Sequence, residues 1–373
     1  MRTTPDYSRA AIDGMANAIE RRLNPRVPMT PEGAVYRSMS LLEIGREFLE
    51  LRGVSTRGMD RFQLSARLLG IEVRSGGMQG TSDFSSLLAN VANKRLRAIY
   101  DENPGTYAMW ARRAPNAPDF REMTVTQLSG APDLLRTSEH GEFKYGTLMD
   151  AGEKYAVVTY GRIVPLTRQA MINDDLRGFD RLVSAFAASA RRLENRLVYS
   201  RLTANAAMAD GVPLFHATRG NLGAGAGSAL QFNALSAGRK AMRLQKGLQG
   251  EELNLTPSYL IVPAALEQTA YQLTSAGYTP AAQSEINEFR QGGRSSLTPV
   301  VEPLLDASSA TAWYLAASGS QVDTVEYCYL DGADGPVIES HTDFGTDGVS
   351  FKCRLDFAAK DIDFRGLYRS DGA

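Results

Sequence analysis

The sequence predicts an α+β fold, in which helical segments and extended segments form separate stretches of the chain. Three observations support this class. Helical patterns with Pro and Gly breaks fill the first hundred residues, and two long extended runs are followed at once by a long amphipathic pattern. The chain then passes through a mixed α/β stretch and closes on residues that alternate with period two, as strands do.

Length and composition restrict the class of protein before any motif is considered. The chain has 373 residues, enough for two domains or one large irregular domain, and 41 basic residues nearly balance 42 acidic ones. This balance excludes a protein that binds nucleic acid mainly by electrostatic attraction to the phosphates. Cys328 and Cys353 form no disulfide framework, which indicates a reducing compartment. Because there is no apolar signal core and no membrane-length run, we expect synthesis and residence in a cytoplasm.

The N-terminal helices have recognisable boundaries. Thr4 and Pro5 can open a helix, and Ser40 with Glu43 has the spacing of a capping box for a later helix that reaches Gly53. Further helices are expected at 60–69 and 82–101, separated by a linker, with the first apolar stripe made of Ile12, Met15, Ile19 and Leu23. Residues 1–80 therefore form either a small bundle or an assembly arm that packs on another subunit. The linker favours the arm.

Two extended runs surround a turn expected at 150–154. Apolar and polar side chains are mixed on both faces of the second run, so this ribbon is expected to project instead of covering a core of its own. Residues 155–167 alone would span roughly 40 Å at about 3.3 Å per residue. An isolated hairpin is marginally stable, so the ribbon needs a partner surface such as another subunit. The expected assembly contacts are Asp150, Glu153, Lys154 and Arg162.

A helix about 37 Å long is predicted over 179–203, at 1.5 Å per residue. Its apolar stripe consists of Phe179, Leu182, Val183, Phe186, Ala190, Leu193 and Leu197. The acceptors Asn173, Asp174 and Asp175 are placed to cap its N-terminus. We expect Leu182, Phe186 and Leu193 to be core residues facing a sheet formed partly by 349–357.

Chemical motifs are weak along the whole chain. The Gly/Ala-rich tract at 220–229 completes no dinucleotide fingerprint, and the sequence has no Walker motif and no G-x-S-x-G elbow. His216 is interpreted as a hydrogen-bonded loop histidine, and Cys353 as an inert core thiol on a strand. Asp361 and Asp363 are expected on a solvated strand face. The sequence therefore predicts no catalytic residue, no metal site and no cofactor.

Four motifs in this order carry a resemblance: "YGRIVPLTRQAMINDDLRGFDRL", "LENRLVYSRL", "PLFHATRGNLG" and "CRLDFAAKDIDFRGLYRSDG". From about Ser82 to the end, the chain resembles the major capsid protein of tailed phages, with the Hong Kong 97-type fold. It is most similar to the Mu-like prophage major head subunit group. The resemblance implies an N-terminal arm (1–80), the start of the peripheral domain (81–135), an extended loop over a neighbour (136–168), a spine helix (169–205), an axial domain (206–340) and returning strands (341–373).

The resemblance also implies a function. The chain would be a structural, non-enzymatic protein of the virion capsid, assembled in the bacterial cytoplasm as pentamers and hexamers of an icosahedral shell. The shell would enclose double-stranded DNA without sequence-specific binding, with scaffold, prohead protease, portal and decoration proteins as partners. Two alternatives stay open: an encapsulin-like compartment, and a cytoplasmic α/β enzyme with a pocket of acid and base groups within 213–315.

Overall fold

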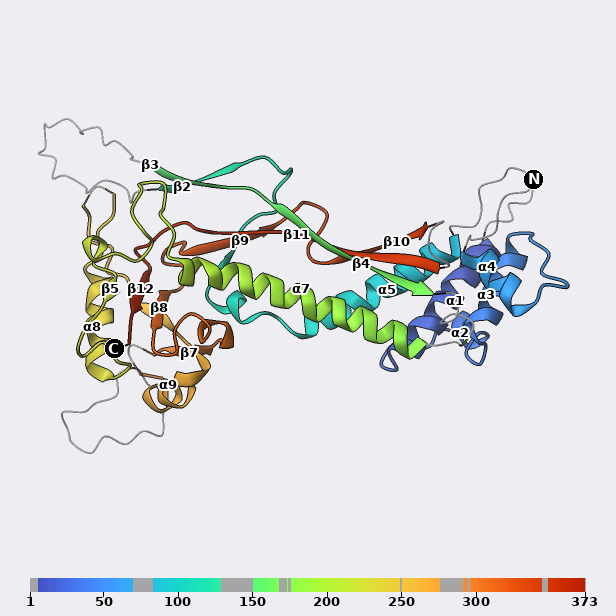
Figure 1. Ribbon diagram of the computed structural model, residues 1–373, viewed down its shortest axis with the longest axis horizontal. Helices are drawn as coiled ribbons and strands as arrows, with labels where there is room; N and C mark the ends of the chain where they lie inside the picture. The colour runs from blue at the N-terminus through green and yellow to red at the C-terminus, as the bar shows by residue number, and fades with distance from the viewer. Residues whose placement is uncertain are drawn as a thin grey trace, which may run out of the picture. The chain divides into compact units, whose positions relative to one another are not determined.

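The computed structural model describes residues 6–69, 83–128, 150–167, 173, 176–248, 250–275, 289, 292–293, 296–343 and 348–372. The α+β class is confirmed: among the described residues, helices precede residue 104, and the strands of three sheets follow it with further helices between them (Figure 1). The chain divides into two units. Unit 1 contains Met1–Pro104, Thr159–Arg191 and Ala333–Asp356, and unit 2 contains Gly105–Val158, Arg192–Gly332 and Phe357–Ala373.

Four of the first helices of unit 1 lie close to the predicted ranges, and the short α2 was not predicted. They are α1 (Asp6–Leu23), α2 (Pro31–Ala34), α3 (Leu41–Leu51), α4 (Arg61–Leu69) and α5 (Asp83–Glu102). The capping box of α3 is confirmed: Glu43 N donates to Ser40 Oγ at 3.3 Å, and Ser40 N donates to Glu43 Oε2 at 2.7 Å. The bonds from Ser40 lower the pKa of Glu43. The linker expected at 74–83 lies almost entirely outside the described residues.

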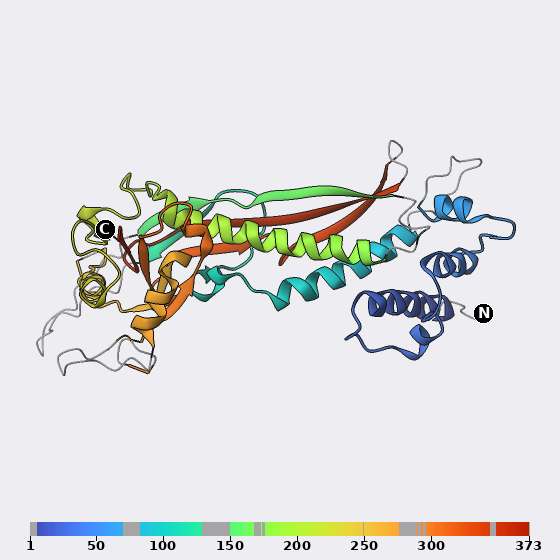
Figure 2. The ribbon, with the colours of Figure 1, turned by 60° about the horizontal axis from the view of Figure 1, so that its bottom comes forward.

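The N-terminal helices share a core of their own, so the expectation of an arm without a bundle is wrong. Helix α1 packs against α2, α3 and α5, and α4 packs against α3 and α5. Figure 2 shows α1 beside α2 and α3. The rings of Phe48 and Phe84 meet edge to face, with 5.5 Å between their centroids. Buried apolar side chains of this core include Met15, Ile19, Ile44, Phe48, Leu64, Phe84 and Leu88. Each helix is too short to bury its stripe alone, but several together do so.

Unit 1 also contains the paired part of a sheet. Strand β10 (Val337–Asp343) runs antiparallel to β11 (Gly348–Asp361), and β4 (Val158–Thr167) also pairs with β11. Helix α5 is fixed to β10 because the Asn93 side-chain amide donates to Ile338 O at 2.8 Å and accepts from Ile338 N at 2.7 Å. A Cβ built at Gly161 would lie only 3.0 Å from Cys353 O, so glycine permits the close approach of β4 to β11.

The extended ribbon differs from the expectation. Strand β3 (Asp150–Tyr155) pairs antiparallel with β2 (Met123–Leu128), and Met123 lies opposite Tyr155. The turn predicted at 150–154 is therefore wrong. The first strand of the predicted hairpin would precede residue 150 and lies outside the described residues, so the hairpin itself stays a prediction. Gly152 is a strand residue, and a Cβ there would lie 3.0 Å from the Thr124 methyl group. Residues 136–149 lie outside the described part of the chain.

The long helix is present as α7 (Leu176–Ala204), but its buried row differs from the predicted one. Phe186 is buried, whereas Leu182 and Leu193 are only half-buried, so their assignment to the core is wrong. The buried row is made of Phe179, Val183, Phe186, Ala187, Ala190, Glu194, Val198, Tyr199 and Leu202. The helix has two adjacent apolar rows. The row that contains the small residue Ala187 is buried, and the row that contains Leu182 and Leu193 is only half-buried. Asn173 is exposed, and Asp174 and Asp175 are not among the described residues.

This register gives a direct test on one helix. Leu202→Ala should lower the free energy of unfolding by about 2–5 kcal/mol, because Leu202 is fully buried (0% exposed) and its removal leaves a cavity. Leu193→Ala removes a half-buried side chain and should have less than half that effect. Urea denaturation followed by circular dichroism measures both. A larger loss at Leu193 than at Leu202 would contradict the register.

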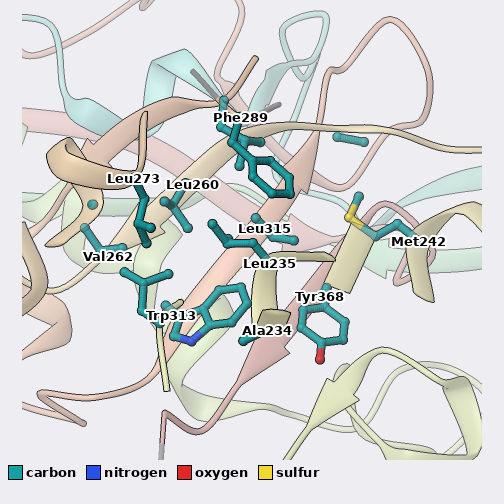
Figure 3. Packing of buried hydrophobic residues seen from close by; sticks show 14 residues of the cluster. Ala234, Leu235, Met242, Leu260, Val262, Leu273, Phe289, Trp313, Leu315 and Tyr368 are labelled. Atoms are coloured by element: carbon teal, nitrogen blue, oxygen red, sulfur yellow. The ribbon is translucent and has the colours of Figure 1, made fainter. Parts of the chain in front are cut away.

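Unit 2 contains a five-stranded mixed sheet in the order β5–β12–β8–β6–β7. Its strands are β5 (Leu222–Gly223), β12 (Leu367–Ser370), β8 (Trp313–Ala317), β6 (Pro257–Val262) and β7 (Thr298–Val301). Helix α8 (Phe232–Arg243) packs against β12, and α9 (Glu267–Thr274) packs against β6 and β7. Figure 3 shows Leu235 and Leu315 at the centre of this core, with Trp313, Tyr368 and Phe289 around them.

The remaining elements of unit 2 surround the end of β11. Strand β9 (Val325–Tyr329) pairs antiparallel with residues 357–361 of β11 and parallel with β1 (Arg112–Arg113). Strand β11 ends at Asp361, and Asp361 and Asp363 are 1% and 6% exposed, so their predicted place on a solvated face is wrong. Short 3-10 turns are η1 (Thr106–Met109), η2 (Ala217–Arg219), η3 (Ala264–Leu266) and η4 (Pro303–Leu305).

Candidate assembly surface

Strand β4 exposes both of its faces. The side chains of Val158 and Ile163 are 50% and 64% exposed, and Arg162 is exposed as well. Because neighbouring residues of a strand point to opposite faces, exposure of both Arg162 and Ile163 means that neither face is fully covered by the described residues. We call Arg162, Ile163 and Pro165 the β4 surface. It can accept a partner on either side.

A side-chain hydrogen bond adds to the strand pairing that holds β4 against β11. Thr159 Oγ1 donates to Asp356 Oδ1 at 2.6 Å, and Arg354 Nε lies 3.2 Å from Asp356 Oδ2. Asp356 is 2% exposed, so this carboxylate is buried between a hydroxyl and a guanidinium. A buried carboxylate satisfied in this way fixes the register of β4 against β11, while Arg162, Ile163 and Pro165 stay exposed.

The predicted charged contacts have different surroundings. Glu153 is 5% exposed, accepts from Ala209 N at 2.7 Å and lies 3.2 Å from Lys360 Nζ, so it anchors unit 2 internally and is wrong as a surface contact. Strand alternation turns Lys154 to solvent instead, and Lys154 and Arg162 are exposed. Asp150 begins β3, but its side chain is not described. The roles of Asp150, Lys154 and Arg162 in assembly stay predictions.

A sequence family described as phage capsid protein matches residues 151–370, which is more than half of the chain and includes β4, α7 and strands β5–β12. The chain belongs to the phage capsid protein family. It is thus a structural protein of the phage capsid, and such proteins act as many copies in one shell.

Solved structures with a similar fold come from phages and a virus-like particle. One is from Mycobacterium phage Adephagia (11% identity, 72% of this chain and 90% of that chain, TM-score 0.45). Another is a phage-related protein from Bordetella bronchiseptica RB50 (12%, 76% and 96%, 0.45). A third is a virus-like particle from Pyrococcus furiosus (10%, 75% and 97%, 0.42). No curated protein sequence matches the capsid protein significantly.

Buried polar groups that sequence reasoning missed stiffen the interior of this capsid protein. Glu194 is fully buried and accepts from Tyr107 OH at 2.9 Å and from Tyr329 OH at 3.3 Å. Its signal in the sequence was its position four residues after Ala190 and four before Val198, inside the buried row. Burial removes water from the carboxylates of Asp361 and Asp363, and this loss of hydration raises the pKa of both groups.

Cys353 and His216, the residues considered above for chemistry, have structural surroundings. Cys353 is 8% exposed, and burial raises its pKa to about 11, which keeps the thiol protonated at neutral pH. His216 Nδ1 lies 2.7 Å from Thr218 Oγ1 and shapes a local turn. Across the part of the chain that the structure describes, no cluster of His, Cys, Asp and Glu could hold a metal ion. Among those same residues, no helix is long and apolar enough to span a membrane.

Proposed function

We propose that the chain is the major capsid protein of an icosahedral phage head with the Hong Kong 97-type fold, enclosing double-stranded DNA. The observation that carries the proposal is the β4 surface: a strand exposed on both faces, with Ile163 64% exposed, inside the segment that belongs to the capsid family. A neighbouring subunit that covers this strand removes apolar surface from water, at about 25 cal/mol per Å².

Many weak contacts are sufficient for a closed shell. An exposed ion pair stabilises a contact by about 0–1 kcal/mol, and Lys154 and Arg162 could each form such a pair with a neighbouring subunit. In a shell every subunit repeats its contacts with neighbours, so the closed assembly is stable while a single contact stays reversible. Pentamers and hexamers provide the two subunit environments that close such a shell. The net charge of −1 is consistent with a shell that encloses DNA without strong electrostatic attraction to it.

The finer assignments belong to the same proposal. Residues 206–340 would form the axial domain, and α7 with the returning strands the peripheral domain. The helices α1–α4, which have a core of their own, would act as an assembly guide within the shell. Assembly would take place in the bacterial cytoplasm with scaffold, protease, portal and decoration partners, and the Mu-like group stays the predicted subgroup.

Sedimentation velocity of the purified chain tests the proposal. A single subunit has a mass of 40.6 kDa, so a closed shell would sediment far faster and as a narrow boundary. We expect this fast species at moderate salt, together with free subunits. Only monomers or small oligomers at every protein and salt concentration would contradict the proposal.

A further inference from the structure

A basic pocket opens on unit 2 beside the end of α8. The cavity has a volume of about 600 Å³ and is lined among others by Arg219, Lys240, Leu244, Lys246 and Phe364. No acidic side chain is part of its lining. We call these five residues the basic pocket. A ligand bound in this pocket should therefore carry negative charge.

The cations of the basic pocket are held in different ways. Arg219 lies over the Phe364 ring, 4.0 Å from its centroid, and Arg219 Nη2 donates to the two carboxylate oxygens of Asp210 at 2.7 and 2.8 Å. Lys240 and Lys246 are exposed, and neither forms an ion pair with a described residue. Asp210 and Asp363 both interact with Arg219, whereas Lys240 and Lys246 present exposed side chains at the pocket.

The pocket is also partly apolar. Leu244 is 65% exposed, although a leucine of this size is usually covered. The alanines Ala217, Ala237 and Ala241 complete the apolar lining. A bare phosphate would leave these groups uncovered. The combination fits a peptide segment that carries a large apolar side chain between carboxylates.

The same unit presents such a segment at 118–122, which we call the Phe120 loop. The Phe120 side chain is 53% exposed, and Asp119 and Glu122 on either side are exposed. Arg121 N donates to Asp119 Oδ1 at 3.0 Å, which shapes the turn, and the Arg121 guanidinium makes only a 3.7 Å exposed contact with the same carboxylate. No residue of this loop lines the pocket of its own chain.

We propose that the Phe120 loop of one copy occupies the basic pocket of a neighbouring copy. Phe120 would cover Leu244, while Asp119 and Glu122 would lie near Lys240 and Lys246. Two different patches of one unit take part, so the contact is head-to-tail and repeats from copy to copy into a ring or an open chain. The inference rests on the proposed function, because it needs copies that assemble.

Charge reversal with rescue tests this contact. Lys240→Glu with Lys246→Glu should reduce the assembled fraction in sedimentation at least tenfold, with thermal unfolding of the subunit unchanged. Adding Asp119→Lys and Glu122→Lys to the same chain should restore assembly, because the attraction is restored with reversed signs. Arg243→Glu is the matched control: Arg243 is exposed on the same helix, bonds Asn254 at 2.7 Å and lies outside the pocket.

Cross-linking locates the contact. In assembled particles, Phe120→Cys with Leu244→Cys and a short bismaleimide should give a ladder of covalent oligomers, and each single variant should give none. The native Cys328 and Cys353 are buried and should stay unreactive. Particles from the parent chain with no ladder and no effect of the charge reversal would overturn this inference alone, whereas absence of particles from the parent would overturn the proposed function as well. Binding of a short DNA duplex that is lost in the lysine variants, with assembly unaffected, would assign the pocket to phosphate and overturn the inference.

Discussion

Replacement of Trp313 by alanine should lower the free energy of unfolding of this capsid protein by about 3–5 kcal/mol, the range for a large buried aromatic residue. Trp313 is 0% exposed and lies on β8 in the middle of the main core of unit 2. Its Nε1 donates to Ser228 O at 2.9 Å, a carbonyl oxygen that also accepts from Ser370 Oγ at 2.7 Å. The alanine variant therefore leaves a cavity and removes one buried hydrogen bond.

A conservative variant separates these two effects. Trp313→Phe keeps most of the apolar volume and loses the donor, so its cost should lie nearer to about 1–3 kcal/mol. Urea denaturation followed by far-ultraviolet circular dichroism measures both variants. If the alanine substitution lowered the free energy of unfolding by less than about 1 kcal/mol, Trp313 would not be a core residue of unit 2.

Ile163→Glu should abolish shells without unfolding the subunit. Ile163 is 64% exposed in the single chain, so a glutamate there meets water and changes subunit stability little. In an assembled shell the same carboxylate would be covered by a neighbour, and an unpaired buried charge costs several kcal/mol. Because every copy carries the change, the loss is repeated at each contact of the shell.

The matched control is Tyr271→Glu. Tyr271 is 47% exposed on α9 and lies outside the β4 surface, so its variant should assemble normally. Sedimentation gives the assembled fraction, and thermal unfolding of free subunits gives their stability. A melting temperature many degrees lower for Ile163→Glu would place β4 in a private core, and normal shells would remove β4 from the subunit interface.

Local signals in the sequence predicted the elements that depend on local chemistry. The Ser40–Glu43 capping box marked the start of α3 because both of its hydrogen bonds lie within four residues. The length of α7 followed from its apolar period in the same way. The prediction of a turn at 150–154 was wrong because these residues form β3, which pairs with β2. No local sequence signal specifies that pairing.

The candidate surface was predicted in part for a similar reason. Mixed faces along β4 indicated an exposed strand, because the alternation of side chains can be read from the sequence. Burial of a charge depends on its partner, and the partners of Glu153 are Ala209 N and Lys360, more than fifty residues away. The basic pocket likewise joins Arg219, Lys246 and Phe364, which only the fold brings together.

Electron microscopy of the full chain tests the central claim most directly, that this protein is a shell-forming subunit whose β4 surface contacts a neighbour. Particles from the fast-sedimenting fraction should be closed shells of uniform diameter, and a density map should show β4 covered by an adjacent subunit at Ile163. Closed shells in which β4 faces solvent would contradict the assigned surface. Small discrete particles under all conditions would contradict the shell itself.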